Sequence, residues 1–297
     1  MNQPSNMLTP QQIVSANIRA AQGKIAFSAL LTILLGIFAG MFIACGASAS
    51  SVAMHAIPNV GIARLVAGCI FPIGLMMIVF VGGELFTGDC LMIMGCMDKR
   101  FSLWNMIRVL AVVFFSNFLG SVVIAGFVSA SGQFDYTSGL LGAFTIKVAL
   151  GKTTMSFGSA FVSGILCNFF VCIAVLMATA AKDIAGKVLA IFFPIMAFVV
   201  SGYEHCVANM YYIPAGIFAA NNGTYVQTAM ETYGYTAAQL EQLSWSNFLM
   251  NNLVPVTLGN IVGGMVCVGL PLYLIHSATI REEEALAKLP QKAKKTA

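Results

Sequence analysis

The sequence predicts an all-α integral membrane protein of six transmembrane helices, built as an inverted 3+3 repeat in which the second and fifth helices are broken. Composition is the first observation: 59% of the 297 residues are hydrophobic and 9% are charged, whereas about 25% of an average soluble domain is charged. An internal repeat and two overlong apolar segments are the other observations. A soluble globular domain is therefore excluded.

Six apolar segments are each long enough to cross the hydrocarbon layer, which is about 30 Å thick. We expect these spans at Phe27 to Gly46, Leu65 to Met97, Met106 to Ser129, Phe157 to Ala180, Val188 to Ala219 and Phe248 to His276. The second and fifth are too long for one straight helix. The chain then divides into a cytoplasmic amphipathic helix (1–26), a pore domain (27–276) and a charged cytoplasmic tail (277–297).

The first 26 residues are polar and do not resemble a cleavable signal peptide. Thr9 is expected to cap a helix that has Pro10 at its first position, with Ile13, Val14 and Ile18 on one face. We expect this helix to lie along the membrane surface.

Basic residues are distributed unevenly between the two sides of the membrane, and this bias orients membrane proteins. With the N-terminus inside, the cytoplasmic side holds twelve of the fifteen, namely Arg19, Lys24, Lys99, Arg100, Arg108, Lys182, Lys187, Arg281, Lys288, Lys292, Lys294 and Lys295. The other side holds Arg64, Lys147 and Lys152. We expect both termini in the cytoplasm, a location in the inner (plasma) membrane, the lipid bilayer as the surroundings, and no nucleic-acid partner.

Eight cysteines fall almost wholly inside the apolar spans, and none forms a C-x-x-C pair. That spacing argues against a dithiol site or a structural zinc site. We therefore expect packing roles for the cysteines, with no metal and no cofactor.

The second and fifth spans resemble each other. Phe71-Pro-Ile-Gly-Leu and a later Gly-Gly-Glu84 correspond to Phe193-Pro-Ile-Met-Ala and a later Gly-Tyr-Glu204. The spans that follow match as well, in Asn117-Phe-Leu-Gly120 and Asn260-Ile-Val-Gly263. Because the duplicated unit contains three spans, an odd number, the second copy must enter the membrane in the opposite direction.

Each overlong span carries glycine and a carboxylate near its middle, which predicts a broken helix. In the second span, Gly82 and Gly83 permit the break, and Thr87 or Asp89 is expected to cap a new half-helix near Cys90. In the fifth span, the break is expected to use a capping box of the S-x-x-E type. The residues assigned structural roles at the breaks are Gly83, Glu84, Ser201, Gly202 and Glu204.

Both half-helices are expected to begin near the bilayer midplane. Their first turns then aim partial positive charge and free N–H groups at one central region. An anion is the expected occupant of that region.

The motif Gly83-Glu84-Leu-Phe-Thr87-Gly88 and the motif Gly202-Tyr-Glu204-His205-Cys-Val-Ala-Asn209-Met resemble the two signatures of the formate/nitrite transporter family. The stretch from Asn252 to Asn260 is similar to that family as well. The resemblance covers nearly the whole chain, and within the family the sequence looks most similar to the hydrosulfide-channel branch.

The resemblance implies an aquaporin-like fold, a homopentamer with one pore in each protomer, and passage of hydrosulfide, formate or nitrite. It also implies a central His205 with Thr87 opposite, aided by Asn168 and Asn260. Phe71, Leu75, Leu85 and Phe198 resemble apolar constrictions of the family, and Lys152 matches a basic residue at the vestibule.

Simpler roles remain open for the same residues. His205 is also suited to be a hydrogen-bonded core histidine, and Thr87 to be only a helix cap. Asn168 and Asn260 are suited to form hydrogen bonds between helices. Lys152 is suited to be a solvated loop charge, and the four constriction residues are suited to be core or lipid-facing side chains.

The function expected from the sequence is a channel for small monovalent anions, with hydrosulfide first because its conjugate acid is weak. His205 would either relay a proton or act as a neutral hydrogen-bond donor. A proton-coupled formate or nitrite transporter is the alternative. A membrane-embedded redox enzyme needs paired axial histidines, and the chain has only His55, His205 and His276. A neutral-solute pore would need paired Asn-Pro-Ala motifs, which the sequence lacks.

Overall fold

The structure is a computed structural model that describes residues 6–288, with side chains to residue 282. Six helical segments of this part are long and apolar enough to cross a membrane. They are Ala29–Met54, Val60–Val81, Leu103–Ala130, Phe157–Ala180, Ile184–Ser201 and Trp245–Glu282. The shorter apolar helices Phe86–Met97 and Cys206–Ala219 continue the second and fifth spans. The six-span fold with two broken helices is thus confirmed.

The first half of the chain contains α1 (Pro10–Ala26), α2 (Ala29–Met54), α3 (Val60–Ile70), α4 (Ile73–Val81), α5 (Phe86–Asp89), α6 (Ile93–Met97) and α7 (Leu103–Ala130). The second half contains α8 (Leu140–Thr153), α9 (Phe157–Ala180), α10 (Ile184–Ser201), α11 (Cys206–Ala219), α12 (Gly223–Tyr233), α13 (Ala237–Leu240), α14 (Trp245–Asn247), α15 (Val254–Ile261) and α16 (Leu270–Lys288). Two π-helical segments, Phe248–Leu253 and Val262–Gly269, join α14, α15 and α16 into the last span.

Two features of the helices differ from the sequence expectations. The first span ends at Met54 rather than Gly46, because its alanines and serines are weakly apolar but pack inside the protein, as the buried Ala47 and Ser50 show. Helices α8 and α12 are additional, and they lie in segments between the apolar spans, where hydropathy gives no signal. The expected tail at 277–297 begins inside α16, and residues 289–297 lie outside the described residues.

The two halves pack with the same contacts. A Cβ added to Gly120 of α7 would lie 2.1 Å from the backbone oxygen of Ile37 in α2, and a Cβ on Gly263 would lie 2.3 Å from that of Ile165 in α9. Such close helix approach through small residues is typical of membrane proteins. The pair α2–α7 and the pair of α9 with the last span, which contains Gly263, are therefore equivalent elements of the inverted repeat, which agrees with the duplication seen in the sequence.

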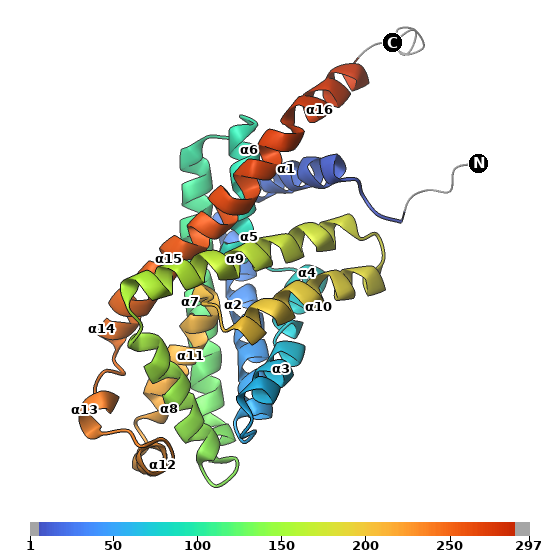
Figure 1. Cartoon of the computed structure of the whole chain (residues 1–297). Helices are drawn as coiled ribbons and strands as arrows, with labels where there is room; N and C mark the ends of the chain where they lie inside the picture. Colours follow the sequence, from blue (N-terminus) through green and yellow to red (C-terminus); the bar gives the residue numbers. More distant parts are fainter. Residues whose placement is uncertain (1–5, 289–297) are drawn as a thin grey trace.

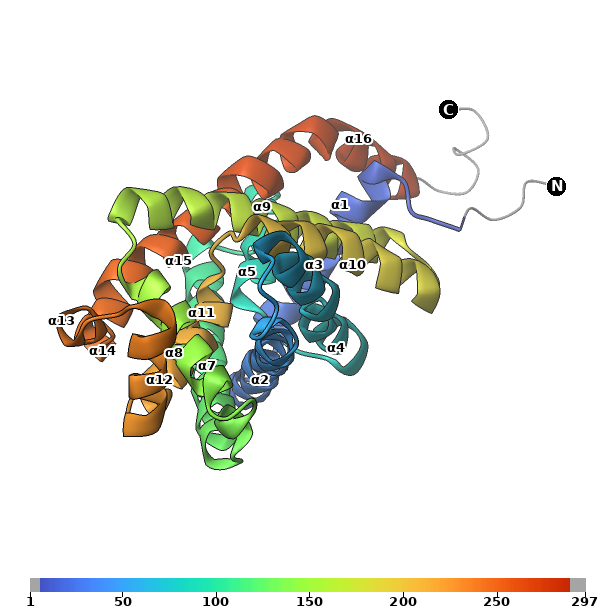
Figure 2. The same cartoon turned by 60° about the horizontal axis from the view of Figure 1, so that its bottom comes forward.

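Helices α1 and α16 lie at one end of the molecule, and α12 and α13 lie at the other (Figure 1). Thr9 caps α1, since its hydroxyl accepts a hydrogen bond from the Gln12 amide while the Gln12 side chain accepts from the Thr9 amide. The half-helices α5 and α11 lie among the other helices rather than at the margin in both views (Figures 1 and 2). The two breaks are thus brought into the protein interior.

Candidate functional site

The first break comprises four non-helical residues between α4 and α5. Helix α4 ends at Val81 and is followed by Gly82, whose positive φ of 104° is a conformation that glycine adopts at little cost. Helix α5 begins at Phe86, and no side chain caps it. The expected cap by Thr87 or Asp89 of a helix from Cys90 is therefore wrong, because the half-helix starts four residues earlier. Thr87 lies in its first turn with its hydroxyl free for another partner.

The second break lies between α10 and α11. Helix α10 ends at Ser201, followed by Gly202 with a φ of 74°. His205 is the N-cap of α11, because its Nδ1 accepts a hydrogen bond of 3.1 Å from the Ala208 amide. The expected capping box of Ser201 and Glu204 is wrong, since the helix starts beyond both residues.

Two asparagines hold the breaks in equivalent ways. The Asn117 amide nitrogen donates to the carbonyls of Gly36 and Glu84, and its oxygen accepts from the Phe86 amide. The Asn260 nitrogen likewise donates to Gly164 and Glu204, and its oxygen accepts from Cys206. Each asparagine thus satisfies backbone groups that the broken helix leaves without partners.

The two half-helices meet through one side-chain pair. Thr87 Oγ1 lies 2.8 Å from His205 Nε2, and both side chains are buried. Because Nδ1 of His205 accepts the Ala208 amide proton, the ring proton of the neutral imidazole is on Nε2, which donates to Thr87. The Thr87 hydroxyl proton can then be donated to a third group. The sequence-predicted partners Thr87 and His205 are brought together here.

Asn168 lies beside this pair but does not present its amide group to it. Its Nδ2 donates to the backbone oxygens of Thr87 and Asn260 at 3.2 and 2.6 Å. Asn168 and Asn260 therefore both fix backbone between helices, which is the simpler of the two roles open to them.

The predicted constriction residues are all buried, but only two of them line the large cavity described below. The rings of Phe71 and Phe198 meet edge to face with centroids 5.6 Å apart, and the Phe198 ring lies 6.1 Å from the His205 ring. Leu75 and Leu85 are buried in the core and do not line this cavity. The phenylalanine pair and His205, which also lines the cavity, thus lie side by side.

Each break carries a carboxylate that forms an ion pair with a lysine. The two lysines come from α8, which precedes α9, and from α1, which precedes α2. Glu204 accepts from Lys152 of α8 at 2.7 Å, and its other oxygen accepts from Asn209 and Asn252. Glu84 accepts in the same way from Lys24 of α1 at 2.6 Å. Both carboxylates are therefore charge-paired inside the protein, as buried carboxylates must be.

Lys24 also pairs with Asp89, so this lysine serves two carboxylates. Burial alone lowers the pKa of Lys24, but the charges of Asp89 and Glu84 outweigh burial and raise the pKa above its ordinary value. The amphipathic helix α1 is thus anchored to the first break by a permanently charged side chain. The sequence pattern placed α1 only on the membrane surface and did not identify this contact.

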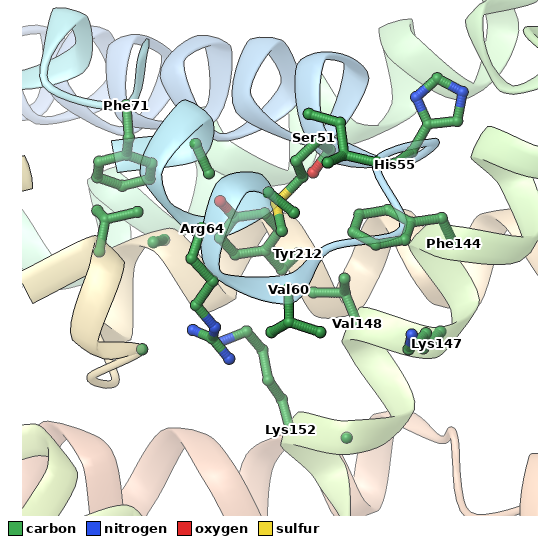
Figure 3. A pocket seen from close by; sticks show the side chains of 18 of the residues that line it. Ser51, His55, Val60, Arg64, Phe71, Phe144, Lys147, Val148, Lys152 and Tyr212 are labelled. Carbon is green, nitrogen blue, oxygen red and sulfur yellow. The ribbon is translucent and has the colours of Figure 1, made fainter. Parts of the chain in front are cut away.

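A cavity of about 930 Å³ opens at the end of the molecule opposite α1. It is lined by Arg64, Lys147 and Lys152, the three basic residues that the orientation count placed outside the cytoplasm (Figure 3). Glu204 is the carboxylate among its lining residues, and Phe71, Phe198 and His205 lie at its inner end. The cavity is therefore electropositive and leads to the phenylalanine pair.

Sequence reasoning did not assign a role to Arg64. A signal was present, because Arg64 directly precedes an apolar span on the side that carries only three basic residues. Among the described residues, no group of three or more His, Cys, Asp and Glu side chains is arranged to hold a metal ion.

Comparisons with known proteins place this geometry in a family. Residues 11–274 match the model of the formate/nitrite transporter family. A probable formate transporter of Methanothermobacter thermautotrophicus is 39% identical over 254 residues, 80% of this chain and 85% of that protein. The formate channel FocA of Haemophilus influenzae is 39% identical over 210 residues, 71% of this chain and 73% of that protein.

A solved structure described as a pentameric formate channel with formate bound superposes with a TM-score of 0.74 at 34% identity, covering 84% of this chain and 97% of that chain. Proteins of this family are transporters and channels rather than enzymes. On the sequence match, the fold and the paired helix breaks, the chain belongs to the formate/nitrite transporter family.

Proposed function

We propose that the protein is a membrane pore for small monovalent anions, with formate as its first substrate. The observation that carries the proposal is the electropositive cavity, in which three basic side chains face one carboxylate and the inner end leads to the Thr87–His205 pair. Such a cavity raises the local concentration of anions at the entrance.

The energies of crossing are compatible with an anion held at the centre. A charge near the bilayer midplane costs at least about 2.5–3.5 kcal/mol. A hydrogen bond to a charged group returns about 1.5–3 kcal/mol, and each helix N-terminus about 0.3–2 kcal/mol. With the Thr87 hydroxyl and the half-helices Phe86–Met97 and Cys206–Ala219 available, these terms offset the cost at the centre. The apolar pair Phe71–Phe198 remains as a barrier.

His205 acts as a neutral hydrogen-bond donor in this proposal. A proton relay requires the imidazolium, in which both ring nitrogens carry protons. Nδ1 of His205 already accepts the Ala208 amide, so protonation would break the cap of α11 and place a cation at the positive end of a helix. The neutral-donor role expected from the sequence is therefore favoured over the relay.

Hydrosulfide, the substrate expected first from the sequence, becomes the second candidate substrate. The relatives named for formate support formate as the first. The phenylalanine pair supports hydrosulfide as well, because an apolar barrier favours an ion whose conjugate acid is abundant near neutral pH. Nitrite shares the planar two-oxygen form of formate and belongs to the same proposal.

The protein is further proposed to be a homopentamer of the inner (plasma) membrane with both termini in the cytoplasm. The description of the solved relative as pentameric supports the oligomer. The packing of α1 against α16, together with the separate group of Arg64, Lys147 and Lys152 at the other end, supports the orientation.

Uptake into proteoliposomes that hold the purified protein tests the proposal. Formate, nitrite, hydrosulfide and chloride are compared with glycerol at acidic and at neutral pH. We expect rapid protein-dependent entry of formate and no entry of glycerol. Entry of glycerol alone would instead support a neutral-solute pore, and Soret or flavin absorbance of the purified protein would support a redox enzyme.

A further inference from the structure

Arg64 is an exposed basic residue that lines the cavity. It lies in α3, and its Nη1 lies 2.2 Å from the position that a Cβ on Gly202 would take. The guanidinium group therefore lies directly against Gly202 in the loop of the second break, and a side chain at position 202 would displace it. Gly202 lies two residues before Glu204, which holds Lys152. Two cations from different helices thus converge on one loop (Figure 3).

Among the described residues, the charge of Arg64 is not neutralised by an ion pair, unlike the charge of Lys152. Lys152 forms an ion pair with Glu204, and the Lys147 ammonium lies 4.4 Å from the centre of the Tyr233 ring. No carboxylate of the described residues forms an ion pair with Arg64, and its side chain is exposed in the cavity. A guanidinium whose donors are free and which lines an anion path is available to bind an anion.

We propose that Arg64 is the specificity-determining residue of an outer capture site. The site selects planar anions with two oxygens, such as formate and nitrite, over anions with a single acceptor atom, such as hydrosulfide and chloride. The inference rests on the proposed function. Arginine presents its N–H groups as a rigid planar fork that binds both oxygens of a carboxylate-like anion at once. Hydrosulfide and chloride offer one acceptor atom, so they gain only the attraction of the charge.

The site lies before the apolar barrier. Arg64 is exposed, whereas Phe71, Phe198 and His205, which line the same cavity, are buried. An anion bound at Arg64 is therefore selected while water in the cavity still solvates it. The central Thr87–His205 pair offers one hydroxyl donor and does not distinguish the shapes of these anions as sharply.

The test compares Arg64→Lys and Arg64→Gln with the wild-type protein in proteoliposomes. Arg64→Lys keeps the charge and removes the fork, so we expect the apparent KM for formate and nitrite to rise roughly ten- to a hundredfold, which corresponds to the loss of one charge-assisted hydrogen bond. The apparent KM for hydrosulfide and chloride should stay the same. Arg64→Gln should raise the apparent KM for all four anions.

Two matched controls accompany these variants. Arg108→Lys makes the same substitution at an exposed position of α7 that does not line the cavity, and it should leave every KM unchanged. Lys147→Gln removes a charge from the cavity without removing a fork, and it should affect all four anions by the same factor.

Failure of this inference and failure of the proposed function are distinguishable. If the wild-type protein conducts formate but Arg64→Lys changes all anions equally or not at all, Arg64 supplies only charge or caps the C-terminus of α10, and the capture site is overturned. If the wild-type protein conducts no anion, the proposed function itself fails. Size-exclusion chromatography of Arg64→Lys should give the same elution volume as the wild-type protein, which would distinguish a loss of selectivity from a loss of folding.

Discussion

Replacing His205 by asparagine separates the two roles that this residue has in the structure. Asparagine is among the best N-cap residues, so it can still accept the Ala208 amide hydrogen bond at the start of α11. It is too short to reproduce the 2.8 Å contact between Nε2 and Thr87 Oγ1. The variant therefore keeps the half-helix and loses the imidazole hydrogen bond that orients the Thr87 hydroxyl at the centre of the path.

The magnitude follows from that single contact. The Thr87 hydroxyl and the His205 ring are both buried, so no water replaces the lost partner at low cost. A buried hydroxyl that loses its hydrogen-bond partner costs about 1–3 kcal/mol, and about 1.4 kcal/mol corresponds to a factor of ten. We therefore expect His205→Asn to reduce formate flux roughly five- to a hundredfold.

Stopped-flow measurement of formate uptake by proteoliposomes provides the assay. Thr87→Ser, which keeps a hydroxyl, should retain most of the flux, whereas Thr87→Val should match His205→Asn, and the double variant should lose little more because both act through one contact. The pH dependence should be the same before and after His205→Asn. Unchanged flux would refute the donor role, and a pH dependence that disappears with the histidine would refute the neutral form.

Three further outcomes follow from the packing. Asn260→Leu removes three hydrogen bonds at the second break, and Asn117→Leu removes the equivalent three, so denaturant titration should show similar losses of roughly 2–4 kcal/mol, and unequal losses would contradict the equivalence. Gly120→Ala meets a backbone oxygen of α2 at 2.1 Å and should lower the Tm, whereas Gly126→Ala, with nothing within 4 Å, should not. The raised pKa of Lys24 means that its stabilising contribution is complete below the ordinary lysine pKa of about 10.4 and is lost only as pH rises beyond that value. The hydrogen-exchange protection factors of α1 should therefore stay constant from neutral to moderately alkaline pH, and Lys24→Met should lower them.

Hydropathy and the internal repeat were sufficient to predict the spans, the inverted repeat and the position of both breaks. This is because the bilayer requires long apolar helices, and because glycine beside a carboxylate is costly in the middle of an unbroken apolar helix. The ends of the half-helices were not predictable in the same way. Phe86 begins α5 without a side-chain cap because the amide oxygen of Asn117, thirty-one residues further along the chain, accepts its N–H.

The composition of the site depends on contacts between distant segments. Thr87 and His205 are 118 residues apart and meet only because the two halves are inverted copies that cross at their breaks. The partners of Glu84 and Glu204 come from α1 and α8, helices that no transmembrane pattern predicts. Arg64 likewise lies against Gly202, in the loop that follows α10. Residue type was sufficient to identify the candidate residues, but their partners could be identified only from the three-dimensional fold.

The current through a planar bilayer that contains the protein, measured under a formate gradient, tests the central claim most directly. An anion pore predicts a protein-dependent current whose reversal potential follows the formate gradient and does not change when the cation is exchanged. A reversal potential that follows the cation gradient, or the absence of any protein-dependent formate current, would contradict the account.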